Sequence, residues 1–382
     1  MEIAKLELFK VPPRWLFLKV TTDDGLVGWG EPIVEGRADT MVAVIKELST
    51  YLIGKDALNI EDTWQVLYRG GFYRGGPILS SAISGIDEAL WDIKGKATGL
   101  PVYDLLGGAV RDKMMVYQWI GGDCPKDVAR VAKEKQQLGL KAVKMNATER
   151  MEWIDSFSKV DEVIERVDDI RNACGEEFGI GIDFHGRVHK TMAKLLLKEL
   201  EPYHPMFIEE PVLAENGEYL KILSELVSTP IATGERYYTR WDFKYLFEQK
   251  AVDIIQPDLS HAGGISECKK IATMAEAYDI VIAPHCPLGP IALAACLQLD
   301  FNSVNAFIQE AGVEIHYNMG VDVQDYVKNK DVFAFKDGYV DLIKGPGLGV
   351  DIDEDKVREM AKIGHNWKNP VWRTNSGVVA EW

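Results

Sequence analysis

Apolar runs that end in a polar residue recur through the second half of the chain. Six of these runs follow one another at intervals of 23 to 27 residues, which is about the length of one strand, one helix and two loops. Amphipathic helical segments, such as residues 153–175, lie between the runs. This alternation predicts parallel strands that are joined by crossover helices. The polar residues that close the six runs are Asp183, Glu209, Glu235, Asp258, His285 and Glu310.

Eight such strands are predicted from about residue 115 onward. They cover residues 116–121, 141–146, 179–185, 206–211, 230–235, 253–258, 280–285 and 306–310. After Glu310 no full helical repeat leads to another strand, so seven strand–helix pairs and one last strand result. Eight parallel strands with crossover helices can close into a barrel. We therefore predict an α/β fold, a (β/α)7β modified TIM barrel.

The N-terminal part shows a different order, with strands first and helices afterwards. A turn-like Asp23-Asp24-Gly25 joins the second and third strands as a hairpin. Gly99 and Pro101 end the last helix of this part. Strands followed by helices without alternation indicate an α+β domain. The predicted strands cover residues 3–11, 15–23 and 26–33, and the predicted helices cover about 38–54, 61–69 and 78–98.

The length of 382 residues suits a barrel of roughly 250 residues plus a second domain. We expect an N-terminal α+β capping domain over residues 1–113 and a barrel catalytic domain over residues 114–344. The tail, about residues 345–382, is expected to fold back onto the N-terminal domain and complete it. No low-complexity linker separates the two domains, so they are expected to pack tightly.

Composition narrows the class of protein. Hydrophobic residues at 47% and charged residues at 27% are typical of a soluble globular protein. No apolar stretch approaches the roughly 20 residues of a membrane span, and the N-terminus lacks a signal-peptide core, so a cytoplasmic location is expected. The five cysteines show no CxxC spacing and are expected to be reduced thiols.

The net charge of −16 bears on the binding partner. It argues against nucleic acid or an anionic membrane as partner, because both bind a basic face. A small anionic substrate is not excluded, since a metal ion and nearby cations reverse the sign of the charge inside a pocket.

Candidate metal ligands come from the strand ends, which meet at one rim where barrel enzymes keep their active sites. The candidates are Asp183, Glu209 and Glu235. Three carboxylates form a hard, all-oxygen site that favours Mg²⁺ or Mn²⁺ over zinc. Glu210 is a rival of Glu209, because successive strand residues point to opposite faces and the pattern alone does not choose between them.

Two histidines lie at the same rim. Asp183 and His185 are two residues apart on one strand, so they project to the same side. Asp258 and His285 end adjacent strands, an arrangement in which a carboxylate fixes the His tautomer and raises its basicity. A metal ion beside a histidine base suits removal of the weakly acidic proton next to a carboxylate, to which a positioned base contributes roughly 10²–10⁴-fold. A second histidine that protonates a departing hydroxyl completes the elimination of water from a hydroxy acid.

Other features carry weaker signals. Lys144 and Asn146 lie two apart on one strand, and they either face the metal-bound ligand or sit at the edge of the core. His316 is a weaker candidate for the rim. The doubled YRGG within residues 68–76 lacks the GK[ST] of a phosphate loop, so we expect a flexible loop or a lid.

Long strings of the sequence match a known family over essentially the whole chain. GWGEP, ALWDIKGKATGLPVYDLLGG and PGLGV resemble the enolase superfamily, which uses a Lys or His base with Mg²⁺. Within it, the chain resembles the mandelate racemase branch and its sugar-acid dehydratases. That closer likeness rests on PPRWLFLKV, GFYRGGPILSSAI, IDFHGRV, FIEEPVLAE, QPDLSHAGGI, APHCPLGPIALAACL and IHYN.

For the metal site, the resemblance implies Mg²⁺, with Mn²⁺ as a substitute, held by Asp183, Glu209 and Glu235. It thereby favours Glu209 over Glu210. The branch often carries a second lysine on the second barrel strand. Asn146 takes that place here, which disfavours a two-base racemase.

For the reaction, the resemblance implies that His285 removes the C2 proton and that Asp258 raises its basicity. His185 would protonate the leaving 3-hydroxyl, and Glu310 would stabilise the intermediate by a hydrogen bond. The implied substrate is D-galactonate, which would become 2-dehydro-3-deoxy-D-galactonate in sugar-acid catabolism. A dehydratase or epimerase for gluconate or mannonate is the alternative. The family also implies a homo-oligomer. A non-catalytic binding protein on this fold is a further alternative, but it would lack a metal ligand or a base, and all of these residues are present here.

Overall fold

An antiparallel sheet of three strands opens the chain in the computed structural model, which describes residues 1–313 and 320–382. The strands are β1 (Ile3–Val11), β2 (Trp15–Thr22) and β3 (Val27–Gly30). β2 and β3 are antiparallel neighbours, so the hairpin predicted at Asp23-Asp24-Gly25 is confirmed. Gly25 has a φ of 88°, a left-handed conformation that glycine adopts without steric cost.

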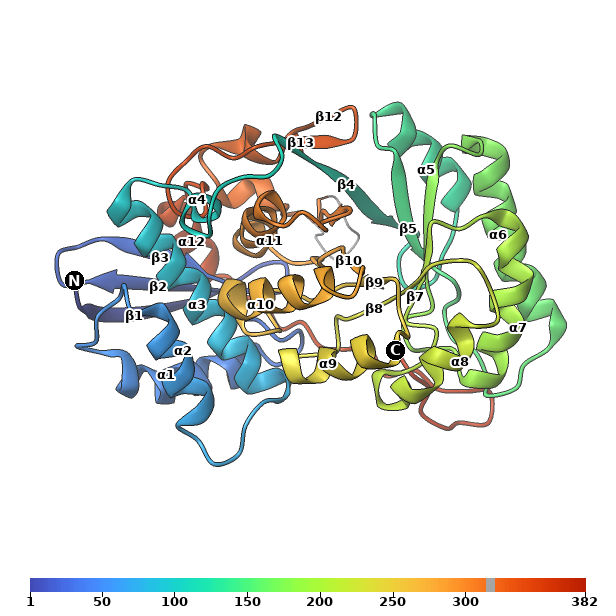
Figure 1. Ribbon diagram of the computed structural model, residues 1–382, viewed down its shortest axis with the longest axis horizontal. Coiled ribbons are helices and arrows are strands. Elements are labelled where there is room, and N and C mark those ends of the chain that lie inside the picture. The colour runs from blue at the N-terminus through green and yellow to red at the C-terminus, as the bar shows by residue number, and fades with distance from the viewer. Residues whose placement is uncertain (314–319) are drawn as a thin grey trace.

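Four helices follow this sheet and gather beside it in one lobe (Figure 1). They are α1 (Ala38–Leu52), α2 (Ile60–Arg69), α3 (Gly76–Thr98) and the short α4 (Val102–Leu105). The three longer helices are those that the sequence predicts. α3 ends at Gly99, whose φ of 72° makes the left-handed C-cap that glycine favours.

Helix α3 lies directly on β3 because glycines remove the side chains at the contact. A Cβ at Gly30 would lie 1.8 Å from the carbonyl oxygen of Gly85. A Cβ at Gly28 would lie 2.1 Å from the carbonyl oxygen of Ala89. The GWG of the sequence is therefore a packing motif that seats the long helix on the sheet.

Replacement of Gly30 by Ala is expected to destabilise the fold by about 1–3 kcal/mol or more, because the backbones of β3 and α3 would have to separate. Thermal unfolding of the purified variant measures the change. Gly71→Ala is the matched control, since its new Cβ meets only the Tyr73 carbonyl oxygen at 3.4 Å. An unchanged melting temperature for Gly30→Ala would contradict this packing.

Eight parallel strands of the described chain form the barrel, where the sequence pattern predicts them. Neighbours in sequence pair in parallel from β4 to β10. β11 pairs in parallel with β4, and one isolated bridge between Ile282 and Ala306 links the segment before β11 to β10. The strands are β4 (Lys113–Ile120), β5 (Ala142–Asn146), β6 (Gly179–Asp183), β7 (Phe207–Glu209), β8 (Ile231–Thr233), β9 (Ile254–Ile255), β10 (Val281–Ile282) and β11 (Gln309–Glu310).

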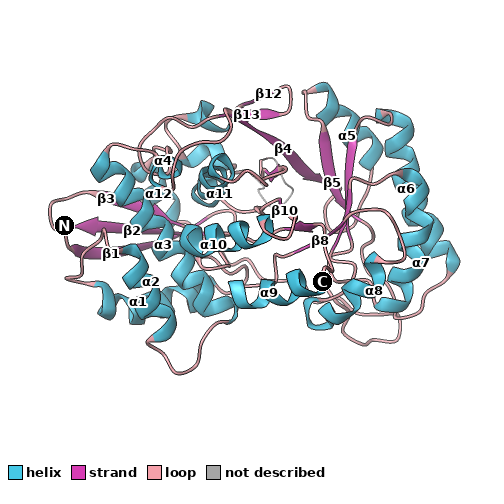
Figure 2. Ribbon diagram, in the orientation of Figure 1, coloured by secondary structure: helices cyan, strands magenta, loops and turns pink. Residues whose placement is uncertain are grey.

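One helix follows each of the first seven strands, so the (β/α)7β order is confirmed. Figure 2 shows helices α5 to α8 stacked along the outer side of the strands. Within the described residues, no helix combines the length and the apolar character that crossing a membrane requires. The helices are α5 (Val128–Gln137), α6 (Phe157–Cys174), α7 (Lys190–Leu200), α8 (Leu220–Ser224), α9 (Arg240–Gln249), α10 (Gly264–Glu276) and α11 (Pro290–Asn302), with the 3₁₀ turns η1 (Glu201–Tyr203) and η2 (Ala214–Tyr219).

The described residues from 320 to 361 contact both parts of the molecule. They include η4 (Val323–Tyr326), η5 (Lys330–Phe333), β12 (Phe335–Lys336), β13 (Tyr339–Asp341) and α12 (Glu354–Ala361). β13 pairs antiparallel with β4, a strand that the sequence pattern did not predict. At α12, the Glu354 carboxylate accepts hydrogen bonds from Lys19 Nζ at 2.7 and 2.8 Å.

The last residues take a different course from the one predicted. Beyond α12 the chain crosses to the barrel, and Figure 1 places the C-terminus near α8. Arg150 Nη2 donates to Asn375 Oδ1 at 2.8 Å, and the Arg187 guanidinium lies 4.5 Å from the ring centroid of Trp372. The tail therefore contacts the N-terminal part as far as His365 and Trp367, and only its last residues lie against the barrel. The domain limits 1–113 and 114–344 and the homo-oligomer stay predictions.

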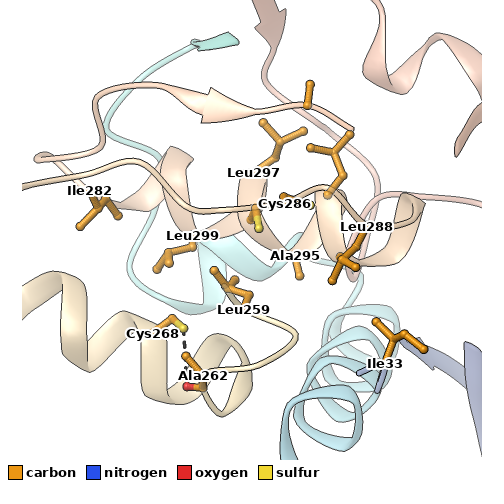
Figure 3. Close-up of a cluster of buried hydrophobic side chains, with 14 of the residues drawn as sticks. Ile33, Leu259, Ala262, Cys268, Ile282, Cys286, Leu288, Ala295, Leu297 and Leu299 are labelled. Atoms are coloured by element: carbon orange, nitrogen blue, oxygen red, sulfur yellow. Dashed lines mark hydrogen bonds between the residues drawn. The ribbon is translucent and has the colours of Figure 1, made fainter. Parts of the chain in front are cut away.

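One hydrophobic core runs through both parts of the molecule. Figure 3 shows Ile33 of the N-terminal part near Leu288, which lies in the loop after β10, and Leu259 of the loop after β9 belongs to the same cluster. Full burial of such a side chain contributes about 1.5–3 kcal/mol. Cys268 and Cys286 are free thiols in the same cluster. This packing holds the N-terminal part against the loops that carry Asp258 and His285.

Candidate active site

A cavity of about 350 Å³ lies where the strand ends meet the N-terminal part. Residues of the N-terminal part, of the barrel rim and of the tail line it. Glu209 and Asp258 do not line the cavity but contact residues that do. Glu209 accepts a hydrogen bond from Lys144, and Asp258 is hydrogen-bonded to His285. The remaining predicted site residues lie on the wall itself, namely Asp183, His185, Glu235, His285 and Glu310.

Three carboxylates gather around one buried lysine. Lys144 Nζ lies 3.0 Å from Glu209 Oε1 and 3.2 Å from Glu310 Oε1. It lies 4.0 Å from Asp183 Oδ2. Burial and the nearby charge of Glu209 raise the pKa of Asp183 well above its ordinary value. Burial opposes the charge of Lys144, but Glu209 and Glu310 outweigh it and hold the lysine pKa well above its usual range.

Glu235, the third predicted ligand, lies two residues after the end of β8 and contacts His285. Its Oε2 lies 3.1 Å from His285 Nε2. Burial disfavours its negative charge, but the imidazoles of His285 and His185 outweigh that cost and hold the pKa of Glu235 far below its ordinary value. The carboxylate is therefore ionised.

The donor chemistry of Asp183, Glu209 and Glu235 fits a hard divalent cation. A divalent ion would also supply the positive charge that the buried carboxylates lack. As the side chains stand, no three His, Cys, Asp or Glu residues of the described chain surround one point as metal ligands would. Lys144 and His285 bond to these oxygens instead, so coordination requires side-chain rearrangement. The ligand assignment stays a prediction.

Glu209 and Glu210 have different partners, because β7 ends at Glu209 and the chain turns at Glu210. Glu209 accepts hydrogen bonds from Lys144 and from Gln256 Nε2, the latter at 2.6 Å. Glu210, whose φ is 42°, lies 3.1 Å from Arg236 Nε. Only Glu209 therefore joins the carboxylates around Lys144.

Asp258 and His285 form a hydrogen-bonded pair. His285 Nδ1 lies 2.8 Å from Asp258 Oδ2, and Asp258 Oδ1 accepts the backbone N–H of Ser260 at 2.8 Å, an Asx turn that fixes the carboxylate. Burial opposes the charge of His285, but Glu235 and Asp258 outweigh it and raise the imidazole pKa well above its ordinary value. His285 Nε2 is thus the nitrogen that faces Glu235, and the raised pKa keeps the ring protonated while that carboxylate lies against it.

His185 lies just beyond β6, in the left-handed region with a φ of 54°. Its backbone N–H donates to Asp183 Oδ1 at 2.6 Å, which orients the carboxylate. Arg236 Nη2 donates to the His185 carbonyl oxygen at 2.8 Å. Burial, with the positive charge of Arg187, lowers the pKa of His185 to about 3, so the imidazole is neutral in the absence of substrate.

His261 is a cavity residue that the sequence pattern missed. Its Nδ1 lies 2.9 Å from Ser81 Oγ, and its Nε2 lies 3.6 Å from Glu35 Oε2 and 3.8 Å from Asp258 Oδ2. Burial opposes its charge, but Asp258 and Glu35 raise its pKa to about 9. The only available signal was its position three residues after Asp258. Arg14, which also lines the cavity, gave no periodic signal.

The weaker sequence candidates have different outcomes. Lys144 belongs to the site, whereas Asn146 Oδ1 accepts a hydrogen bond from Trp119 Nε1 at 3.0 Å. His316 lies outside the described residues. The YRGG repeat spans the end of α2, an exposed loop with Phe72 at its tip, and the start of α3. A lid role for this loop stays a prediction.

Two family models match the chain in succession. The N-terminal domain of mandelate racemase / muconate lactonizing enzyme matches residues 12–107. The enolase C-terminal domain-like model matches residues 127–356, which is more than half of the chain.

Individual relatives match over the whole length. The chain is 57% identical to a D-galactonate dehydratase of Pectobacterium atrosepticum and 58% identical to one of Ralstonia pickettii, each over 382 residues and 100% of both sequences. Among solved structures, an enolase from Agrobacterium radiobacter with bound Na and L-malate has 31% identity and a TM-score of 0.89, over 100% of each chain. A member of the enolase superfamily from Salmonella Typhimurium has 29% identity and a TM-score of 0.86, over 94% of this chain and 98% of that one. The chain therefore belongs to the enolase superfamily, in its mandelate racemase and muconate lactonizing enzyme branch.

Proposed function

We propose that this chain is a D-galactonate dehydratase, a hydro-lyase that converts D-galactonate to 2-dehydro-3-deoxy-D-galactonate and water. The observation that carries the substrate assignment is the identity of 57–58% with two D-galactonate dehydratases over the entire chain. The geometry supports the reaction class, because one cavity presents a His–Asp pair and a second histidine beside buried carboxylates. Arg14 and Lys144 on the cavity wall supply positive charge for an anionic sugar acid.

Asp183, Glu209 and Glu235 are the side chains that would hold Mg²⁺, or Mn²⁺ in its place. Their oxygens are hard donors, and they lie at or just after the ends of neighbouring strands, with Asp183 and Glu235 on the cavity wall and Glu209 behind it. When bound, the ion would stabilise the negative charge that develops on the substrate carboxylate by several kcal/mol. Lys144 and His285, which contact these oxygens in the structure, would then face the substrate.

In the first step, His285 Nε2 takes the C2 proton, since its Nδ1 is engaged with Asp258. Once Glu235 binds a cation in place of His285 Nε2, the raised pKa of the ring would fall and Nε2 would be free to accept that proton. The aspartate holds the ring orientation and stabilises the imidazolium that forms. A base positioned in this way contributes roughly 10²–10⁴-fold to the rate. Glu310, 4.0 Å from His285 Nε2, is proposed to hydrogen-bond the enediolate, and the charge of Lys144 stabilises the same anion.

In the second step, His185 gives a proton to the 3-hydroxyl. The C3–O bond breaks, the electron pair of the enediolate forms the C2–C3 double bond, and water leaves. The resulting enol becomes the 2-keto acid. Because burial holds the pKa of His185 at about 3 in the free site, the ring acquires its proton only when an anionic substrate lies beside it and raises that pKa.

Replacement of His185 by Asn is expected to block dehydration while His285 still exchanges the C2 proton with solvent. The reason is that the two histidines act on different bonds, and dehydration loses the roughly 10²–10⁴-fold contribution of its acid. Proton NMR in D₂O on residual D-galactonate, together with a keto-acid assay, measures both events. Loss of exchange with retained dehydration would reverse the acid and base assignments.

The test of the proposed function is a panel assay with Mg²⁺ and a set of sugar acids, read by formation of 2-keto-3-deoxy products. We expect D-galactonate to react far faster than its epimers, with activity lost on chelation. Preference for gluconate or mannonate would keep the reaction class and overturn the substrate assignment. No product from any acid would overturn the function itself.

A further inference from the structure

An aromatic side chain of the tail forms one wall of the cavity. Trp382 lies against His185, with ring centroids 6.2 Å apart and an interplanar angle of 67°, an edge-to-face arrangement that aromatic rings favour. Both residues line the same cavity. The indole Nε1 and His185 Nδ1 are buried and have no hydrogen-bond partner in the structure. A buried N–H donor without a partner is costly, which indicates a group that bonds only when the cavity is filled.

The tail that brings Trp382 to this place is tied to the molecule along its length. Trp367 contacts Trp382 at 5.9 Å between ring centroids, and the guanidinium of Arg14 lies 5.4 Å from the centre of the Trp367 ring. Further along, Trp372 lies under Arg187 and Asn375 accepts from Arg150. These contacts hold the indole against His185 from both the N-terminal part and the barrel.

We propose that Trp382 is a positioning residue for the elimination step. Its ring edge fixes the plane of the His185 imidazole and keeps water from the space between this imidazole and the substrate 3-hydroxyl. Its unpartnered Nε1–H is the donor for a hydroxyl oxygen of the bound sugar acid. This inference rests on the proposed function, because His185 matters here as the acid of a dehydration.

The contact between Trp382 and His185 affects the elimination step and not the removal of the C2 proton. Trp382 touches His185, whereas the His285 ring is held by Asp258 and Glu235. Its loss therefore leaves removal of the C2 proton in place and slows the transfer of a proton from His185 to the 3-oxygen as the C3–O bond breaks. Misplacement of a reacting group by about 1 Å costs about 100-fold.

The experiment compares Trp382→Ala and Trp382→Phe with the parent protein in D₂O, in the presence of Mg²⁺. Keto-acid formation reports dehydration, and deuterium at C2 of the residual D-galactonate reports the base step. For Trp382→Ala we expect dehydration to fall by about 10- to 100-fold, with deuterium entering the residual substrate faster than product forms. Trp382→Phe keeps an aromatic edge and loses the N–H, so dehydration is expected to recover in part.

Trp153→Ala is the matched control, because it removes an indole that is 70% exposed and does not line the cavity. It is expected to leave both reactions unchanged. Equal loss of deuterium uptake and dehydration in Trp382→Ala, or no loss of either, would overturn the inference. If the parent protein acts on no sugar acid, both the proposed function and this inference fail. The assay of the parent protein identifies that outcome and so distinguishes it from a failure of the Trp382 role alone.

Discussion

Replacement of His285 by Asn is expected to abolish dehydration and C2 proton exchange together, each by about 10⁴-fold, the upper range for loss of a positioned base. Asn keeps a planar polar group that can still bond to Asp258, so packing at the site is preserved. It has no nitrogen that accepts a proton at neutral pH. Both steps depend on removal of the C2 proton, so neither survives. Keto-acid formation and deuterium uptake from D₂O measure the two losses in one sample.

His204→Asn is the control for this variant. The His204 side chain is 76% exposed, and its φ of 49° is a conformation that Asn tolerates. It should retain full activity. Persistent deuterium uptake in His285→Asn would mean that another group removes the proton, with Lys144 the first candidate because it lines the same cavity and, like His285, lies near Glu310.

Replacement of Glu209 by Gln is expected to weaken Mg²⁺ binding at least about 100-fold, since loss of a partner beyond the ligands already costs 10–100-fold. Dehydration should fall with it. The substitution keeps the volume of the side chain, and Glu310 still neutralises Lys144, so the barrel should remain folded. Calorimetric titration of the purified protein with Mg²⁺ reads the metal site without any reaction.

Glu210→Gln provides the matched comparison, one residue further along the chain. Glu210 is also fully buried, but it lies against Arg236 and away from Lys144. We expect it to bind Mg²⁺ like the parent protein, whatever the loss of the Arg236 contact does to turnover. The reverse order of Mg²⁺ affinities would assign the ligand role to Glu210.

The barrel was predictable because its signals are local. A strand and a helix each impose their own period on the apolar positions, and their alternation alone implies parallel strands. The ends of parallel strands must then share a rim, whatever the details of packing. That geometry brought Asp183, Glu235, His285 and Glu310 to one cavity without knowledge of any contact. The hairpin at Asp23-Asp24-Gly25 was predictable for the same reason, since turn chemistry involves only neighbouring residues.

Other features depended on contacts between segments that are far apart in sequence. His261 lies in the site, where it contacts Ser81 and Glu35 of the N-terminal part. β13 is a strand because it pairs with β4. Periodicity does not encode such pairings. It also did not predict that the last residues of the tail pack on the barrel.

The fold class, the rim and the residue types that gather there therefore follow from local patterns in the chain. Which neighbour each side chain meets depends on how distant segments pack. This tertiary packing turns Glu209 towards Lys144 and Glu210 towards Arg236, and it lays Trp382 against His185. The physical reason is that periodicity follows from the backbone geometry of each element, whereas these contacts are set by the packing of one element on another.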